Sequence, residues 1–320
     1  MVDSKQQWKA WLYLSPAILL LLIFTVWPIF NTIRMAFLEN YSGLRAVGGE
    51  TFKFGIGNFT YVLRYRNFIQ CLKITVILCV VTVPISTLLA LLIAVCLNSI
   101  KPLSRVLQTI FFLPYVTNSI AIGMVFTAMF NIISTIGADG AVEITSPGII
   151  NYIFTFFGAK PINWINSGSS ETSNIIVMII YIVMIIYIVW NALPFKILIL
   201  LGGLQSVNKQ YYDAAKVDGT SRSRVFWRIT VPLLSPMIAY VVITGFIGGF
   251  KEYTSIVGIF GSKMGPAHDQ GRMNTMVGFI YDSLSSNSQG RASAAALILF
   301  VIILIVTLIN LYVSKKRVHY

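Results

Sequence analysis

Six long apolar stretches dominate the pattern of this chain. A helix rises about 1.5 Å per residue, so about 20 apolar residues are needed to cross the ~30 Å hydrocarbon core of a bilayer. The stretches that reach this length are residues 11–33, 74–97, 106–133, 175–193, 233–259 and 292–313, and a continuation of the fourth to Leu201 is an alternative. The pattern predicts an all-α membrane protein with six transmembrane helices in a single domain, residues 1–320. The third and fifth stretches are long enough to tilt or to break into two pieces.

The first stretch follows two lysines, Lys5 and Lys9, so a cleaved signal peptide is an alternative interpretation. A signal peptide has an apolar core of about 7–15 residues and a small-x-small cleavage site after it. This stretch is longer and no such site follows it, so we expect a retained first span.

The positive charges favour one orientation of the predicted spans. If the N-terminus is cytoplasmic, the cytoplasmic segments are 1–10, 98–105, 202–232 and 314–320, which hold twelve Lys and Arg in 56 residues. The outer segments, 38–73, 134–174 and 260–291, hold nine in 109 residues. Cytoplasmic loops are enriched in Lys and Arg. We therefore expect both termini inside, which agrees with an even number of spans.

The composition supports a membrane protein and excludes several other classes. Of the 320 residues, 56% are hydrophobic and only 11% charged, against about 25% charged in an average soluble domain. A soluble globular protein and a disordered one are both excluded. The net charge of +13 fits basic cytoplasmic loops, so we expect no nucleic-acid partner.

The chain lacks the residue patterns of catalytic and metal sites. The cysteines Cys71, Cys79 and Cys96 are odd in number and form no C-x-x-C, so neither a disulfide framework nor a zinc site is expected. The two histidines, His268 and His319, cannot supply a metal cluster. No phosphate-binding G-x-x-x-x-G-K-[ST] loop, H-E-x-x-H or G-x-S-x-G is present. The sequence therefore predicts no catalytic residues, no metal and no cofactor bound by this chain.

Charged residues within the spans are functional candidates, because burying a charge in lipid is costly. The pair Lys251-Glu252 lies about two-thirds of the way along the fifth stretch. Helical neighbours point about 100° apart, so one of them can line a central passage while the other finds a partner or snorkels. Lys196, like Arg34 and Lys73, lies near a span end, where we expect snorkelling to the interface.

The longest cytoplasmic connection, residues 202–232, predicts a helix–turn–helix. Lys209–Val217 reads as a short helix, and Gly219 suits its C-terminal stop, where a positive φ is often needed. Thr220 or Ser221 can cap a second helix over 222–230, and Pro232 then opens the fifth span. Ala214 and Ala215 are small, so a partner could approach the first helix closely.

This connection resembles a known signature. Asp213-Ala214-Ala215-x-x-Asp218-Gly219, followed by Ile229-x-Val231-Pro232, is similar to the E-A-A-x-x-x-G…I-x-L-P motif of permease subunits of binding-protein-dependent ABC importers. Three further motifs resemble the sugar-permease branch related to the maltose and glycerol-phosphate permeases. They are Gly148-x-x-Asn151…Gly158…Trp164, then Trp190-x-x-x-Pro194-Phe195…Gly203-Leu204-Gln205, and Gly265-Pro266…Asn274-Thr275…Tyr281…Gly290-x-Ala292-x-Ala294. Together the motifs cover residues 10 to 314 in order and in spacing.

The resemblance implies a type I ABC importer permease fold in which the signature forms a coupling helix that lies in a cleft of a cytosolic ATPase. The implied coupling residues are Asp213, Ala214, Ala215, Asp218 and Gly219. Asp213 replaces the glutamate of the family, so its carboxylate is one methylene shorter. The implied partners are a second and unlike permease subunit, two ATPase subunits that bind ATP and Mg, and an extracytoplasmic solute-binding protein.

The resemblance also implies where substrate passes. Similarity to the maltose permease places substrate-facing positions at Ile188, Asn191, Ala192, Phe195, Gly245, Gly248, Gly249 and Glu252. Several of these are small or apolar, which indicates a wide cavity or a passage whose specificity is set by the binding protein. The alternative is that most of them only pack helices together.

The function implied is import of a sugar or oligosaccharide across a bacterial or archaeal cell membrane. Uronate oligosaccharides and glycerol phosphodiesters are alternative substrates, because Lys251 makes a charged substrate compatible with the passage. A self-contained secondary carrier or channel is the alternative of a different class, although one acid within the spans is few for a proton relay. A polytopic membrane enzyme lacks a visible nucleophile or metal cluster.

Overall fold

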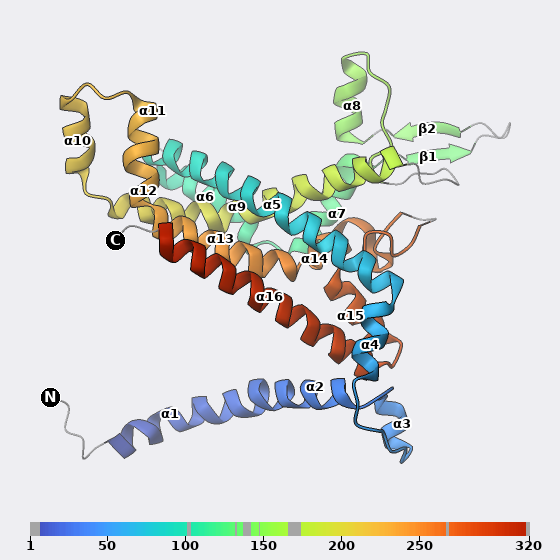
Figure 1. Ribbon diagram of the computed structural model, residues 1–320. Coiled ribbons are helices and arrows are strands. Elements are labelled where there is room, and N and C mark those ends of the chain that lie inside the picture. Colours follow the sequence, from blue (N-terminus) through green and yellow to red (C-terminus); the bar gives the residue numbers. More distant parts are fainter. Residues whose placement is uncertain are drawn as a thin grey trace. The chain divides into compact units, whose positions relative to one another are not determined.

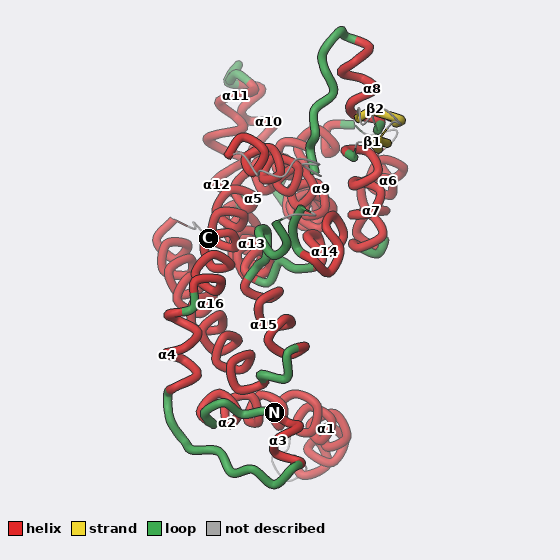
Figure 2. Tube along the Cα trace, turned by 90° about the vertical axis from the view of Figure 1, so that its right-hand side faces the viewer, coloured by secondary structure: helices red, strands yellow, loops and turns green. Residues whose placement is uncertain are grey.

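The computed structural model describes residues 7–100, 104–131, 133–136, 142–146, 148–165, 174–266 and 269–317. These residues are mostly helical (Figure 1; Figure 2). The chain divides into two compact units. The first consists of Met1–Ile69 and Phe279–Val301, and the second of Gln70–Gly278 and Ile302–Tyr320. Each unit thus combines segments that are distant in the sequence.

Four continuous helical segments are long and apolar enough to cross a membrane: Trp8–Phe37, Arg66–Ser99, Ile175–Ser206 and Gln289–Lys316. They correspond to the first, second, fourth and sixth predicted stretches, and each extends beyond the predicted bounds. The first comprises α1 (Gln7–Leu21), the π-helical turn η2 (Leu22–Val26) and α2 (Trp27–Phe37). The other three are α5 (Arg66–Ser99), α9 (Asn174–Ser206) and α16 (Gln289–Arg317).

The third apolar stretch is broken. Its two helices, α6 (Ser104–Val116) and α7 (Ser119–Phe130), meet at a bend of 98°. Asn118 stabilises the break, because its side-chain oxygen accepts hydrogen bonds from the backbone N–H groups of Ile120 and Ala121 at the start of α7. The helix ends at Phe130, three residues before the end of the predicted stretch, and Ile133 already belongs to a strand.

The fifth stretch is interrupted twice. Helix α11 (Arg222–Val225), the π-helical turn η3 (Phe226–Thr230) and α12 (Val231–Leu233) run into α13 (Ser235–Phe250) at a bend of 69°. Helix α13 then stops before Lys251, and α14 (Thr254–Phe260) follows after three residues. Six spans result if each bent pair counts as one, so the described chain has four to six candidate spans.

Short elements complete the described chain. The antiparallel strands β1 (Ile133–Ile136) and β2 (Val142–Ser146) form a hairpin that sequence analysis did not predict. The remaining helices are α3 (Gly43–Val47), α4 (Gly57–Arg64), α8 (Ile149–Phe156), α10 (Lys209–Val217), η4 (Gly261–Lys263) and α15 (Met276–Ser285).

Helix α9 supplies much of the core of the second unit. Its fully buried side chains Ile180, Met184 and Tyr187 pack in one apolar cluster with Leu78 of α5 and Ile256 of α14. Further along α9, Leu200 and Leu204 belong to a second cluster that includes residues of α5 and Leu234. Contacts of this kind hold α9 in place along most of its length, so its polar residues face fixed surroundings.

Helices α7 and α14 approach each other unusually closely. A Cβ atom added to Gly123 of α7 would lie 2.5 Å from the Cα of Gly258 in α14, and one added to Gly258 would lie 2.9 Å from the Cα of Gly123. Thr127 Oγ1 donates a hydrogen bond to the carbonyl of Ile259 (2.9 Å) across the same contact. Small residues permit such backbone contact between helices in a membrane.

We expect Gly123→Ala to destabilise the protein by about 1–3 kcal/mol, because the added methyl group overpacks the contact with Gly258. The matched control is Gly202→Ala in α9, where an added Cβ meets nothing within 4 Å. The same gain in helix propensity accompanies both changes. Thermal unfolding in detergent should show a lowered midpoint for the first variant only, and equal midpoints would contradict the glycine contact.

Candidate functional site

A cavity of about 300 Å³ lies among α5, α6, α9 and α13 of the second unit. All eight positions that the resemblance implied as substrate-facing line it: Ile188, Asn191, Ala192, Phe195, Gly245, Gly248, Gly249 and Glu252. Its walls also contain residues that sequence analysis did not assign to a passage, namely Thr82, Val83, Ser86, Tyr115, Lys196 and Thr244. All the predicted substrate-facing positions therefore lie around one cavity.

The three glycines of α13 have different surroundings. A Cβ atom added to Gly249 would lie 2.7 Å from Cys79 Sγ, and one added to Gly245 would lie 3.1 Å from Val83 Cγ1. These two glycines allow α5 to pack closely against α13. Gly248 instead faces open space, with nothing within 4 Å of an added Cβ. Close packing thus describes Gly245 and Gly249, and an open cavity describes Gly248.

Lys196 is buried, and the expectation that it snorkels was wrong. Its side chain is 4% exposed, and Nζ donates hydrogen bonds to Ser86 Oγ (2.7 Å), Thr87 Oγ1 (2.9 Å) and the carbonyl of Val83 (3.2 Å). The physical reason is that α9 continues to Ser206, so Lys196 lies well inside the helix and not near its end. A lysine ammonium has three protons, and α5 accepts all of them.

The acceptors of Lys196 are held in place by their own hydrogen bonds. Ser86 Oγ donates to the carbonyl of Thr82 (2.6 Å), and Thr87 Oγ1 donates to the carbonyl of Val83 (2.7 Å). Their oxygen lone pairs are thereby directed at the ammonium. Hydrogen bonds to a charged group are stronger than neutral ones. This polar cluster fixes α9 to α5 at the wall of the cavity.

Glu252 also differs from its predicted setting. Lys251 and Glu252 lie in the break between α13 and α14, not within one helix, so they are not helical neighbours on two faces. Glu252 Oε1 accepts hydrogen bonds from the backbone N–H groups of Tyr253 and Ser255, both at 3.1 Å. The carboxylate thus satisfies donors at the start of α14, where negative charge is favourable. Lys251 is exposed.

An aromatic pair forms another part of the cavity wall. The rings of Phe195 in α9 and Tyr115 in α6 stack with centroids 5.8 Å apart and an interplanar angle of 21°. Aromatic faces are common in sugar-binding sites, together with hydrogen-bonding groups. Phe195 could be predicted from the sequence but Tyr115 could not, because no motif connects the third stretch to this site.

The helix–turn–helix of residues 202–232 is confirmed in its main elements. Helix α10 spans Lys209–Val217 as predicted, and Gly219 adopts φ +64° just after it. Asn208 Oδ1 accepts a hydrogen bond from the backbone N–H of Gln210 (3.0 Å) and so caps the helix. Ser221 precedes α11, but its side chain makes no capping hydrogen bond. Figure 1 shows α10 and α11 together at the end of α9 away from α8 and the hairpin.

The residues of the predicted coupling signature do not all face outward. Ala215 is only 5% exposed, so its side chain packs inward. Ala214, Asp218 and Gly219 are exposed. Asp213 is exposed and forms a surface pair with Lys216 (3.3 Å). The outward face of α10 therefore presents Asp213 and Ala214 to a partner.

The motif at Gly148 to Trp164 organises a segment at the opposite end of α9. The buried Asn151 of α8 donates to the carbonyl of Ile162 (2.9 Å), and its side-chain oxygen accepts from the N–H of Ile162 (2.9 Å) and from Trp164 Nε1 (3.0 Å). Gly148 has φ +53°, and a Cβ there would lie 2.4 Å from the carbonyl oxygen of Asn131. These residues have structural roles that explain their spacing.

Among the described residues, no group of three or more His, Cys, Asp or Glu side chains could hold a metal ion. Cys71, Cys79 and Cys96 form no disulfide; the first two are buried and Cys96 is exposed. His268 and His319 lie outside the described residues. The candidate site thus consists of the cavity and the exposed surface of α10.

A family model described as the inner membrane component of binding-protein-dependent transport systems matches residues 83–319. The chain belongs to this family. It is therefore a permease subunit of an ABC importer, integral to the membrane, and not an enzyme. The alternative of a self-contained carrier or channel is not retained.

Curated relatives match nearly the whole chain. The lactose transport system permease protein LacF of Rhizobium radiobacter is 30% identical over 316 residues, which cover 97% of this chain and 95% of that protein. The arabinooligosaccharides transport system permease protein AraP of Bacillus subtilis is 28% identical over 310 residues, with 95% and 88% covered.

A solved structure has the same fold. It belongs to a bacterial ABC transporter involved in the import of the acidic polysaccharide alginate, and it matches with a TM-score of 0.75 at 21% identity. The match covers 98% of this chain and 97% of that one. The permease fold that the sequence motifs implied is confirmed.

We expect Glu252→Ala to lower the stability by about 1 kcal/mol, because the N–H groups of Tyr253 and Ser255 lose their acceptor. The matched variant, Glu252→Gln, keeps an acceptor oxygen and removes only the charge, so its unfolding midpoint should stay near that of the wild type. The rate of substrate uptake by Glu252→Gln should change more than the amount of ATP hydrolysed per substrate molecule transported. Thermal unfolding in detergent and uptake in vesicles measure these effects. Equal loss of stability in both variants would contradict the capping role.

Proposed function

We propose that this chain is the transmembrane subunit of an ATP-driven importer for a sugar or oligosaccharide, and that substrate passes through the 300 Å³ cavity between α9 and α13. The observation that carries this proposal is the gathering of all eight predicted substrate-facing residues around that cavity. The relatives named for lactose and arabinooligosaccharides support the substrate class. The stacked rings of Phe195 and Tyr115 offer a face to a sugar.

In this proposal the chain has six spans, with each bent pair crossing once, and both termini lie in the cytoplasm of a bacterial or archaeal cell. Helix α10 then lies on the cytoplasmic side, where Asp213, Ala214, Ala215, Asp218 and Gly219 form the contact with one ATPase subunit. Ala215 contributes by packing α10 in place, since its side chain faces inward. The basic content of the 202–232 connection supports this orientation.

The complete importer in this proposal contains a second, unlike permease subunit, two ATPase subunits that bind ATP and Mg, and an extracytoplasmic solute-binding protein. One solved structure with this fold is an alginate ABC transporter in complex with a periplasmic protein bound to an alginate pentasaccharide. That architecture is compatible with the partners proposed for this chain.

A second candidate substrate class is an acidic solute, such as a uronate oligosaccharide or a glycerol phosphodiester. The ammonium of Lys196 in the cavity wall attracts an anion and the carboxylate of Glu252 in the same wall repels it, so an acidic solute would bind on the Lys196 side of the cavity. A relative named for sn-glycerol-3-phosphate transport is 27% identical over 312 residues. Uptake assays with a neutral oligosaccharide and its uronate counterpart distinguish the two classes.

We expect Gly219→Pro to abolish uptake without blocking membrane insertion. Proline cannot adopt the φ of +64° found here, so the turn after α10 must change and the helix is displaced. Gly219→Asn is the matched control, since asparagine tolerates this conformation. Uptake and co-purification of the ATPase measure both variants. Normal substrate-stimulated ATP hydrolysis by the assembled Pro variant would refute the coupling role.

We expect Gly248→Leu to reduce uptake to background while the complex still assembles. The leucine side chain extends into the cavity from Gly248, where an added Cβ meets nothing within 4 Å, and it occupies part of the space through which substrate would pass. Gly202→Leu is the control, because Gly202 also has no atom within 4 Å of an added Cβ but lies away from the cavity. Uptake of labelled oligosaccharide into vesicles is the measurement. Full transport by the Gly248 variant would place the passage elsewhere.

A further inference from the structure

Helix α8 projects sideways from the second unit. Figure 1 shows it near the end of α9 away from α10, and both Figure 1 and Figure 2 show it running across the direction of α9. It packs against α7, the second half of the broken third stretch. With eight residues it is too short to cross a bilayer. The helix therefore lies beside the spans, near one end of them.

Both faces of α8 are apolar. On the inward face, Ile150 packs in the apolar cluster of the second unit, and the ring of Phe154 lies against that of Trp164, with centroids 5.8 Å apart. The side chains of the opposite face are exposed, from 50% for Ile153 to 81% for Phe156. This outer face of α8 consists of Ile149, Tyr152, Ile153, Phe156 and the following Phe157. A helix that is apolar on all sides is typical of a protein core or of lipid.

The outer face of α8 offers few polar groups to water. Asn151 is buried on the inward side of the helix. The hydroxyl of Thr155 donates a hydrogen bond back to the carbonyl of Tyr152 (2.9 Å). Residues 148–159 contain no charged side chain, and the first charge after them is that of the exposed Lys160. Contact with water does not account for this composition.

The projecting end of α8 is closed by backbone hydrogen bonds. The N–H of Ala159 donates to the carbonyl of Phe154 (3.0 Å), and the N–H of Gly158 donates to the carbonyl of Thr155 (2.9 Å). Gly158 has φ +81°, which this C-terminal motif requires. Carbonyl groups without partners are costly where water is scarce. This end of the helix is therefore suited to surroundings of low polarity.

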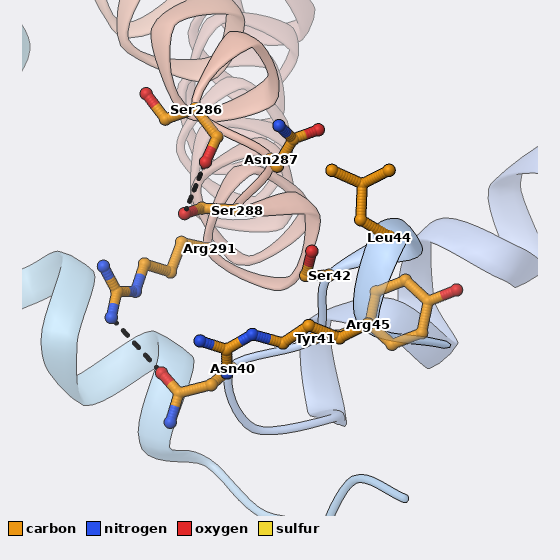
Figure 3. A pocket seen from close by; sticks show the side chains of 9 residues that line it. All are labelled: Asn40, Tyr41, Ser42, Leu44, Arg45, Ser286, Asn287, Ser288 and Arg291. Atoms are coloured by element: carbon orange, nitrogen blue, oxygen red, sulfur yellow. Dashed lines mark hydrogen bonds between the residues drawn. The ribbon is translucent and has the colours of Figure 1, made fainter. Parts of the chain in front are cut away.

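The ends of the first and last long helices provide a contrast. Figure 3 shows the cavity of about 630 Å³ that residues 40–45 and 286–291 form there, in the first unit. Its lining includes serines, asparagines and two arginines, and Arg291 donates a hydrogen bond to Asn40 Oδ1 (3.2 Å). Such side chains are typical of segments that meet water. The outer face of α8 has none of them.

We propose that α8 is an interfacial anchor, whose outer face lies in lipid at the boundary between the headgroups and the acyl chains. Helices that lie along a membrane bury their apolar face at this depth, and tyrosine is enriched there. Lys160 then extends its ammonium toward the lipid phosphates. A protein partner would be expected to meet a polar rim around the face, and the charge-free segment 148–159 does not provide one. The proposal depends neither on which way the spans are oriented nor on the substrate.

The anchor would hold α7 at a fixed depth in the membrane, because α8 is mounted rigidly on it. A Cβ added to Gly148 would lie 2.4 Å from the carbonyl oxygen of Asn131, directly after α7. The ring of Trp164, which hydrogen-bonds to Asn151 of α8, also packs edge-on against Phe130 of α7, with centroids 5.7 Å apart. The position of α8 is thereby transmitted to the helix that contacts α14.

The test replaces Phe156 by the photoreactive analogue p-benzoylphenylalanine in the complete importer. The complex is reconstituted in nanodiscs of phosphatidylethanolamine and phosphatidylglycerol and illuminated, and mass spectrometry identifies the molecule that becomes attached. We expect a lipid adduct on an acyl chain near the glycerol. Phe154 is the matched control, since it is the same residue type on the inward face, and its replacement should attach within this chain with loss of the lipid adduct. Uptake by both variants shows that they fold and assemble, and Tyr152 is a second site on the outer face if the Phe156 variant does not.

Two results overturn the anchor. Attachment of the Phe156 probe to the second permease subunit or to a solute-binding protein would show that the outer face of α8 is a protein interface. No lipid adduct at Phe156 or Tyr152, under illumination that labels lipid from Phe24 or Phe300 in the first and last long helices, would show that the face meets water. Phe24 and Phe300 are exposed side chains within these apolar helices, so they calibrate the yield.

Discussion

A polar group within the apolar segments of this chain must find its hydrogen-bonding partner inside the protein, because lipid offers none. Lys196 meets this requirement through three acceptors of α5, and it thereby fixes α9 to α5. Glu252 and Asn118 meet it at helix starts, where they accept hydrogen bonds from free backbone N–H groups. Asn118 and Glu252 also mark the positions where helices break, and Lys196 and Glu252 form part of the cavity wall.

The helix breaks give the second unit a geometry that straight spans could not provide. The bend at Asn118 and the break at Glu252 set α7 and α14 against each other, where Gly123 and Gly258 bring the backbones into contact. Because α13 ends before Lys251, its glycines and Glu252 lie along one side of the cavity. Gly248 leaves space there, while Gly245 and Gly249 accommodate neighbouring side chains. Along α13, glycines that permit close packing therefore lie next to a glycine that borders open space.

Features of the fold that depend on local pattern could be predicted from the sequence. Apolar length identified the helical stretches, and the order of charges and glycine in the 202–232 connection identified α10 and the turn at Gly219. Features that depend on contacts between distant residues could not be predicted. The apolar run to Leu201 allows α9 to continue past Lys196, but nothing in the sequence shows that Ser86 and Thr87 lie opposite it. The inward orientation of Ala215 depends on packing that the spacing of residues does not reveal, and the hairpin replaced the end of an apolar run.

The order of elements along the chain connects the proposed coupling helix to the cavity without any intermediate partner. Helix α9, which carries Asn191, Phe195 and Lys196, leads at its end into α10. Through α11 and α12 the chain then enters α13, which carries Gly245 and Gly248. A rigid displacement of α10 would therefore act on both helices that line the cavity. Because Lys196 ties α9 to α5, such a displacement would be resisted by α9 and expressed more fully in α13, whose bend at Leu234 and break at Lys251 allow it to move.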